Sequence, residues 1–164
     1  MFITLKTACA ILAISLATPV LADEVILTVS GDVAASNQGE TWIFDLTGLQ
    51  ALPAVRFETS TIWTEGIQSF EGVPLVTLLS HVGAAQGAIR AIALNDYAIT
   101  IPTTDAVEGG PIVAYMRDGV EMSIRDKGPL WIIYPFDGNK IYKSEEYYAR
   151  SIWQLDRIEI VAEN

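Results

Sequence analysis

The fold is specified most directly by the segment from Arg125 to Pro135, which reads Arg-Asp-Lys-Gly-Pro-Leu-Trp-Ile-Ile-Tyr-Pro. Its Gly-Pro pair is typical of a turn, and the apolar run that follows predicts a buried strand. A second segment, Ala149 to Leu155, reads Ala-Arg-Ser-Ile-Trp-Gln-Leu. We predict that the two segments form walls of one pocket, with cations at its mouth and aromatic rings inside. The alternative is a core strand that ends in a solvated turn.

The first 22 residues have the pattern of an export signal. Lys6 precedes an apolar run from Ala8 to Leu16, and small residues end the segment at Ala22. The apolar run has roughly half of the ~20 residues that a membrane span needs. We therefore expect residues 1–22 to be a cleaved signal peptide and residues 23–164 to be one periplasmic domain, without membrane insertion after cleavage. A retained N-terminal anchor is the alternative.

Charge and composition exclude several classes of function. The formal net charge is -10, and removal of residues 1–22 would take away Lys6 and no acidic residue. Nucleic acids bind to a basic protein surface, and a mature chain this acidic argues against one. We therefore expect no nucleic-acid partner. The only cysteine is Cys9, in the predicted signal, and the only histidine is His81. This argues against a disulfide, a catalytic thiol and a His/Cys metal site.

Hydrophobic periodicity predicts an α+β fold, a single β-rich domain with a mixed sheet and short helices. Pro74 suits the first position of the clearest helix, whose apolar stripe would end at Gly83. Short connections at Asn95-Asp96 and Asp118-Gly119 predict β-turns. The expected strands are 24–30, 40–46, 55–61, 89–94, 97–102, 112–116 and 120–124, with a closing strand over 152–155 and 158–161.

Three groups of motifs, spread over about residues 55–161, resemble the molybdopterin-binding domain of the sulfite-oxidase family. The first is Thr59-x3-Trp63 with Phe-Glu-Gly-Val-Pro-Leu at 70–75. The second is Asn-Asp-Tyr at 95–97, the hairpin at 118–119 and Gly-Pro-Leu at 128–130. The third is Tyr134-Pro135 with Ala-Arg-Ser-Ile at 149–152. The order and spacing of these motifs, rather than any one of them, carry the resemblance.

Two departures from the family pattern bear on chemistry. The resemblance implies a molybdenum-ligating cysteine at the place that Thr59 holds, and a hydroxyl does not supply a soft thiolate. The resemblance also implies a lysine after Arg-Ser-Val in the family enzymes, and Trp153 stands at that place here, which favours stacking on a flat ring over holding a charged tail. Both changes argue against the molybdenum cofactor.

The chain is most similar in pattern to a cysteine-lacking branch of this family that contains periplasmic pterin-binding regulatory proteins. The resemblance implies a reduced pterin ligand, similar to tetrahydromonapterin or tetrahydrobiopterin. It also implies a partner, the periplasmic domain of an inner-membrane signalling protein such as a cyclic di-GMP cyclase, a phosphodiesterase or a histidine kinase. We therefore expect a regulatory protein rather than an enzyme. The alternatives are a molybdopterin-dependent oxidoreductase and an interaction module without a ligand.

A pterin needs a stacking ring, an acceptor for its amino-pyrimidine edge and donors for its oxo group and side chain. Arg125, Lys127 and Arg150 are candidate donors, although surface ion pairs with Asp126, Glu145 or Glu146 are an alternative for each. Trp131 is expected in the core. The full set of candidate ligand-binding residues is Thr59, Trp63, Asn95, Asp96, Arg125, Lys127, Tyr134, Arg150, Ser151 and Trp153.

Overall fold

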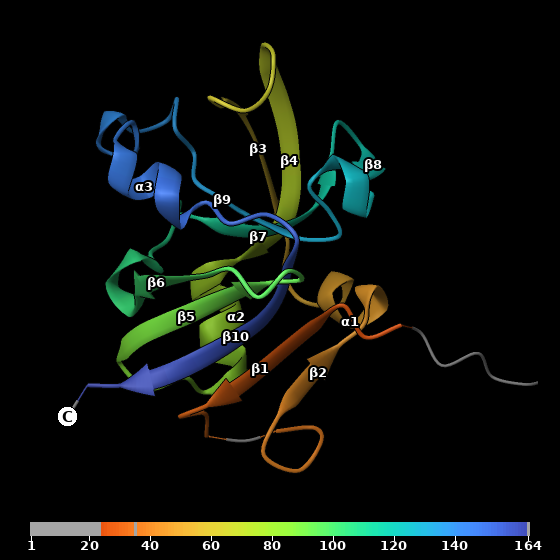
Figure 1. The fold of residues 1–164 in the computed structure, drawn as a ribbon, viewed down its shortest axis with the longest axis vertical. Coiled ribbons are helices and arrows are strands. Elements are labelled where there is room, and N and C mark those ends of the chain that lie inside the picture. The colour runs from red at the N-terminus through yellow and green to blue at the C-terminus, as the bar shows by residue number, and fades with distance from the viewer. Residues whose placement is uncertain (1–23, 35, 164) are drawn as a thin grey trace, which may run out of the picture.

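A computed structural model describes residues 24–34 and 36–163, which form two five-stranded sheets (Figure 1). The predicted signal peptide lies outside the described residues. The first sheet is mixed, because β1 and β10 run parallel to each other, whereas every other pair of neighbouring strands in this sheet is antiparallel. Its order is β2 (Trp42–Phe44), β1 (Leu27–Gly31), β10 (Leu155–Ala162), β5 (Gly87–Ala93) and β6 (Ala98–Pro102). The predicted mixed sheet and α+β class are confirmed.

The second sheet is antiparallel throughout and is organised around β7. One edge of β7 pairs with β4, while its other edge pairs with β8 and β9. The close approach of β4 to β7 requires Gly72, since a Cβ there would lie 2.1 Å from the carbonyl oxygen of Val113. The strands are β3 (Val55–Ser60), β4 (Ile67–Pro74), β7 (Ile112–Arg117), β8 (Val120–Glu121) and β9 (Trp131–Ile133).

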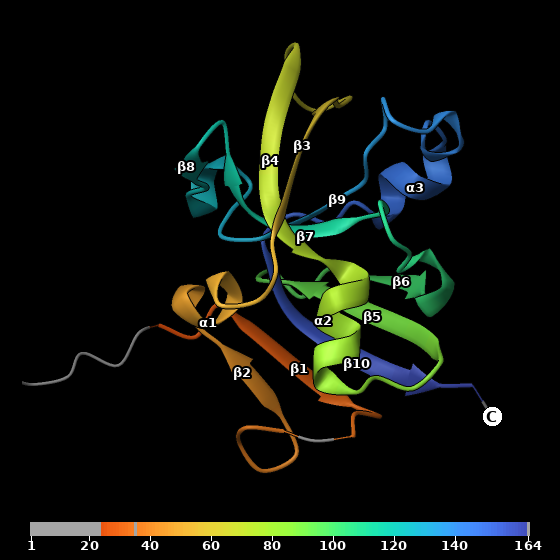
Figure 2. The ribbon, with the colours of Figure 1, turned by 180° about the vertical axis from the view of Figure 1, so that it is seen from behind.

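The helices are short and cover the sheets. The α-helices are α1 (Leu46–Gln50), α2 (Leu75–Val82) and α3 (Glu145–Arg150), and 3-10 turns span Thr103–Asp105, Ile124–Asp126 and Lys140–Tyr142. The apolar stripe predicted for α2 is buried, and the helix packs across β5 and β10 (Figure 2). The stripe consists of Leu75, Leu78, Leu79 and Val82. As predicted, α2 ends at Gly83, which adopts the left-handed conformation. Within the described residues, no helix is both long and apolar enough to cross a bilayer.

Several strand boundaries differ from the sequence-based prediction, and the strands predicted over 40–46 and 120–124 shorten to Trp42–Phe44 and Val120–Glu121. Two further differences have a clear structural cause. Residues 67–74 form β4, which local patterning did not predict, and Pro74 precedes the helix because it still pairs with Ile112 in the sheet. The closing strand begins only at Leu155, since residues 152–154 follow an irregular path in which Gln154 adopts a φ of 53°. The second deviation places Ile152, Trp153 and Gln154 at the cavity described below.

The hydrophobic core is built from buried side chains of both sheets, of α2 and of the segment that follows β9. Its largest fully buried side chains include Trp131, Tyr134, Phe70 and Phe136, so Trp131 is a core residue, as expected. The hairpin projects away from the first sheet, and α3 lies beside it (Figure 1). Aromatic residues between the hairpin and α3 form one wall of the candidate site.

Candidate functional site

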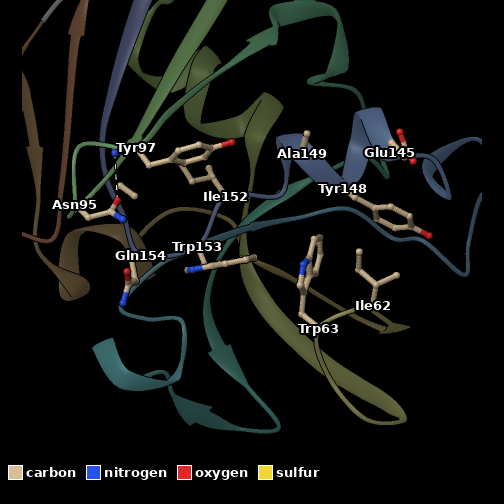
Figure 3. Close-up of a pocket in the computed structure, with 11 residues that line it drawn as sticks. Ile62, Trp63, Asn95, Tyr97, Glu145, Tyr148, Ala149, Ile152, Trp153 and Gln154 are labelled. Atoms are coloured by element: carbon tan, nitrogen blue, oxygen red, sulfur yellow. Dashed lines mark hydrogen bonds between the residues drawn. The ribbon is translucent and has the colours of Figure 1, made fainter.

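A cavity of about 480 Å³ opens between the hairpin loop, the β5–β6 turn, α3 and the segment before β10 (Figure 3). This volume is typical of a small-molecule site. The lining is mainly apolar and aromatic, with three polar side chains. The lining residues are Ile62, Trp63, Ala93, Asn95, Tyr97, Glu145, Tyr148, Ala149, Ile152, Trp153 and Gln154.

Aromatic rings packed edge to face build one wall of the cavity. The ring centroid of Trp63 lies 5.6 Å from that of Trp153 and 5.8 Å from that of Tyr148, with interplanar angles of 71° and 86°. Beneath them, Trp131 is fully buried, and its indole N–H donates to the carbonyl oxygen of Ser151 at 3.1 Å. Trp153 remains 37% exposed. The wall therefore combines a fixed base with an indole that is accessible for stacking.

The backbone around Trp153 is held from three directions. The amide of Ile132 in β9 donates to the carbonyl oxygen of Ile152 at 2.9 Å. On the other side of Trp153, the amide of Gln154 donates to the carbonyl oxygen of Lys127 at 3.0 Å, and the carbonyl oxygen of Gln154 accepts from Leu94 at 2.9 Å. Together these hydrogen bonds hold Gln154 in the left-handed conformation. This conformation is energetically unfavourable for residues other than glycine. The strain is located beside the exposed indole.

Four of the predicted site residues meet at or next to this cavity. Trp63, Asn95 and Trp153 line it. The ammonium group of Lys127 lies over the Trp153 ring, 5.1 Å from its centroid, and 5.9 Å from that of Trp131. This geometry is a cation–π contact, which keeps a positive charge beside the aromatic wall.

Three other predicted residues lie in a buried network behind α3. The guanidinium of Arg150 pairs with the carboxylate of Asp105 at 2.9 Å (Nη1 to Oδ2) and also with Glu146, a partner offered above as an alternative to the ligand. The phenol of Tyr134 donates to Asp105 Oδ2 at 2.8 Å, and burial followed by this hydrogen bond raises the pKa of Tyr134. The hydroxyl of Ser151 donates to the carbonyl oxygen of Tyr147 at 2.8 Å. None of the three predicted residues lines the cavity.

The remaining predicted residues are also outside the lining. Asp96 adopts a φ of 63° in the β5–β6 turn and pairs with Arg157 on the surface, while Arg125 is exposed on a 3-10 turn. Of the candidate cationic donors, Lys127 therefore lies beside Trp153, whereas Arg125 and Arg150 lie outside the cavity lining. Asp126, which was a candidate partner for these cations, pairs instead with Arg117.

Thr59 is fully buried on β3 and has two backbone partners. Its hydroxyl accepts from the amide of Asp137 at 3.0 Å and donates to the carbonyl oxygen of Ser60 at 3.3 Å. The resemblance implies a thiolate ligand of molybdenum at this position. The structure has instead a hydroxyl, which is a hard oxygen donor and is already hydrogen-bonded to the backbone. In the part of the chain that the structure describes, no three His, Cys, Asp or Glu side chains are grouped to hold a metal ion. The Thr59 hydroxyl does not supply the thiolate that the family pattern implies for molybdenum at this position.

Apart from the two tryptophans and Asn95, the residues that line the cavity were not among the candidates predicted from the sequence. Tyr97, Tyr148 and Gln154 lie on a turn, a short helix and an irregular segment, none of which has a periodicity that marks a site. Glu145 was considered only as an ion-pair partner, and it lines the cavity near Tyr148 (Figure 3). The signal that was available is proximity in sequence, because Tyr97 follows Asn95 and Gln154 follows Trp153.

Asp137 fastens the β3–β4 hairpin to the loop that follows β9. Its carboxylate accepts from the ammonium of Lys143 at 2.6 Å and from the amide and hydroxyl of Ser60. The Lys143 hydrogen bond, followed by those from Ser60, lowers the pKa of Asp137 from 3.8 to about 2. A lowered folded-state pKa means that the carboxylate contributes stability above its unfolded pKa, and that this contribution is lost as the pH falls toward 2.

We accordingly expect Asp137→Asn to lower the melting temperature at about pH 6, with a difference from wild type that closes as the pH falls from about 4 to about 2. Thermal unfolding followed by circular dichroism across this range measures it. Glu58→Gln, which changes an exposed carboxylate on the same hairpin, is the matched control. A pH-independent difference for Asp137→Asn would contradict the ionic role of this carboxylate.

Comparison with known proteins bears on the fold. No protein-family model and no curated protein match the chain. Among solved structures, it is similar to the crystal structure of the sulfane dehydrogenase SoxCD from Paracoccus pantotrophus, with a TM-score of 0.62 and 15% sequence identity. The match covers 84% of this chain but 38% of that chain, so this protein spans well under half of its length. At this identity the likeness shows the fold alone, and it confirms the predicted α+β fold of the sulfite-oxidase molybdopterin-domain type.

Proposed function

We propose that this protein binds a reduced pterin, without metal chemistry, in the cavity beside Trp153. The observation that carries the proposal is the combination of an accessible indole, held at 5.6 Å from a second indole, with a cavity of about 480 Å³ that ends in side-chain amides. A flat bicyclic ring can stack on such a wall, and each aromatic contact contributes about 0.5–1.5 kcal/mol beyond the burial of area. Polar groups at the end of the cavity then orient the ring.

A phosphate-tailed molybdenum cofactor is a poorer match to the same residues. Thr59 offers no thiolate and is hydrogen-bonded within the protein. The guanidinium of Arg150, which is the basic group of the best-matching motif, is neutralised by Asp105 and Glu146. A terminal phosphate would have to compete with these carboxylates. The proposal is therefore a binding function rather than an oxidoreductase activity.

The proposed setting is the periplasm, and the proposed role is to report the pterin to the periplasmic domain of an inner-membrane cyclic di-GMP enzyme or sensor kinase. The sequence pattern of residues 1–22 and the resemblance of the motifs support this part of the proposal. Ligand binding would act through a difference in the affinity of that partner for the bound and free states.

The first test is the native ligand content of protein purified from the periplasm. An anaerobic acid extract is analysed for pterins by fluorescence and mass spectrometry, and molybdenum is measured in parallel. A stoichiometric reduced pterin without molybdenum is the expected result. Molybdenum with its organic cofactor would overturn the proposal in favour of an oxidoreductase. If the protein carries neither and does not bind added tetrahydropterin, an interaction module without a ligand replaces the proposal.

A further inference from the structure

Two side-chain amides at one end of the cavity have orientations that are fixed by backbone groups. Asn95 Oδ1 accepts from the amide of Tyr97 at 3.2 Å, so its Nδ2 is the group left to donate. Gln154 Nε2 donates to the carbonyl oxygen of Ile124 at 2.7 Å, so its Oε1 is the group left to accept. Within residues 24–34 and 36–163, neither remaining group has a hydrogen-bond partner, and both residues line the cavity. The two hydrogen bonds to the backbone thus leave one side-chain donor, Asn95 Nδ2, and one side-chain acceptor, Gln154 Oε1, available to a ligand.

The donor and the acceptor lie on neighbouring segments of the first sheet. The amide of Leu94 donates to the carbonyl oxygen of Gln154 at 2.9 Å, and Ala93 pairs with Leu155 in the β5–β10 ladder. Both side chains extend from the same end of the cavity, with Trp153 next to them (Figure 3). A ring that stacks on Trp153 can therefore present one edge to both amides.

We propose that Asn95 and Gln154 read the lactam edge of the ligand, which has a ring carbonyl next to a ring N–H. Asn95 Nδ2 donates to the carbonyl, and Gln154 Oε1 accepts from the N–H. This inference rests on the proposed pterin-binding function and specifies its chemistry, because the 2-amino-4-oxo edge of a pterin contains such a lactam. A pteridine with an amino group in place of the oxo group presents a donor to Asn95 Nδ2, and two facing donors cannot form a hydrogen bond.

The test compares two ligands that differ only at this edge, 6-hydroxymethylpterin and 2,4-diamino-6-hydroxymethylpteridine, both in the tetrahydro form under anaerobic conditions. Binding is measured by calorimetry with the mature protein. We expect the wild type to prefer the pterin by about tenfold or more, since a site built to hydrogen-bond an edge rejects an analogue that leaves its polar groups unpaired. Asn95→Asp keeps the oxygen that accepts from Tyr97 but replaces the donor by an acceptor. This variant is expected to lose the preference or to reverse it.

Asp96→Asn is the matched control, because it changes the next residue of the same turn, outside the cavity lining, and should keep the wild-type preference. Equal affinity of the wild type for both ligands, or an unchanged ratio in a folded Asn95→Asp protein, would overturn the lactam assignment while leaving pterin binding in place. Failure of the wild type to bind either ligand would overturn the proposed function and this inference with it.

Discussion

Trp153→Ala is expected to weaken the binding of a tetrahydropterin by roughly 5- to 150-fold. Removing an aromatic side chain that stacks on a heterocyclic base costs about 1–3 kcal/mol, and pterins have a similar π-face. Trp153 is the appropriate indole to change because it is 37% exposed, whereas Trp131 beneath it is fully buried. The ring of Trp63 would remain on the wall, so some affinity should be retained. Calorimetric titration under anaerobic conditions measures the change.

Two further variants separate stacking from general disturbance of the site. Trp153→Phe keeps a smaller aromatic face and should lose less affinity than the alanine variant. Ile124→Ala removes an exposed apolar side chain that does not line the cavity but keeps the backbone carbonyl that accepts from Gln154, so it should bind as the wild type does. Wild-type affinity in Trp153→Ala would mean that the ligand does not use this indole. Equal losses in all three variants would indicate a distorted site instead.

The parts of the fold that the sequence predicted well are those with a local cause. The stripe of α2 and the turn at Asp118-Gly119 depend on the spacing of neighbouring residues, and the structure contains both. By contrast, β4 contains Gln68, Ser69 and Gly72 and has no clear alternation, so its strand conformation follows from pairing with β3 on one side and β7 on the other. Pairing with distant segments is not visible in a local window.

The same distinction applies to the candidate site. Aromatic character and family resemblance pointed to Trp63 and Trp153, and both line the cavity. The direction of the charged side chains depended on partners far away in the sequence. Arg150 turns toward Asp105, which is 45 residues earlier, and away from the cavity. A motif can therefore identify the segment that forms a site without identifying which of its side chains meets the ligand.

Arg150→Ala is expected to lower the free energy of unfolding by about 3–5 kcal/mol, which is the usual cost of removing one partner of a buried ion pair. The side chains of Arg150 and Asp105 are 15% and 9% exposed, so the variant would leave a carboxylate shielded from water with only the Tyr134 phenol as a donor. Chemical denaturation monitored by fluorescence measures the loss. Arg157→Ala, which breaks an exposed ion pair with Asp96, should cost less than about 1 kcal/mol.

The Arg150 variant also distinguishes a structural role from the ligand contact that the sequence motif implies. If Arg150 mainly fastens α3 to the turn at Asp105, adding Asp105→Asn should recover part of the lost stability, because no unpaired charge then remains buried. Affinity measured on the folded fraction should fall only to the extent that Tyr148 and Ala149, which α3 contributes to the cavity, are displaced. If Arg150→Ala is instead as stable as the wild type but binds no pterin, the guanidinium acts on the ligand directly. In that case the guanidinium of Arg150 would have to leave Asp105 when the ligand binds. The single variant Asp105→Asn, which keeps Arg150, should then bind the pterin more tightly than the wild type, because no carboxylate at position 105 would hold the arginine.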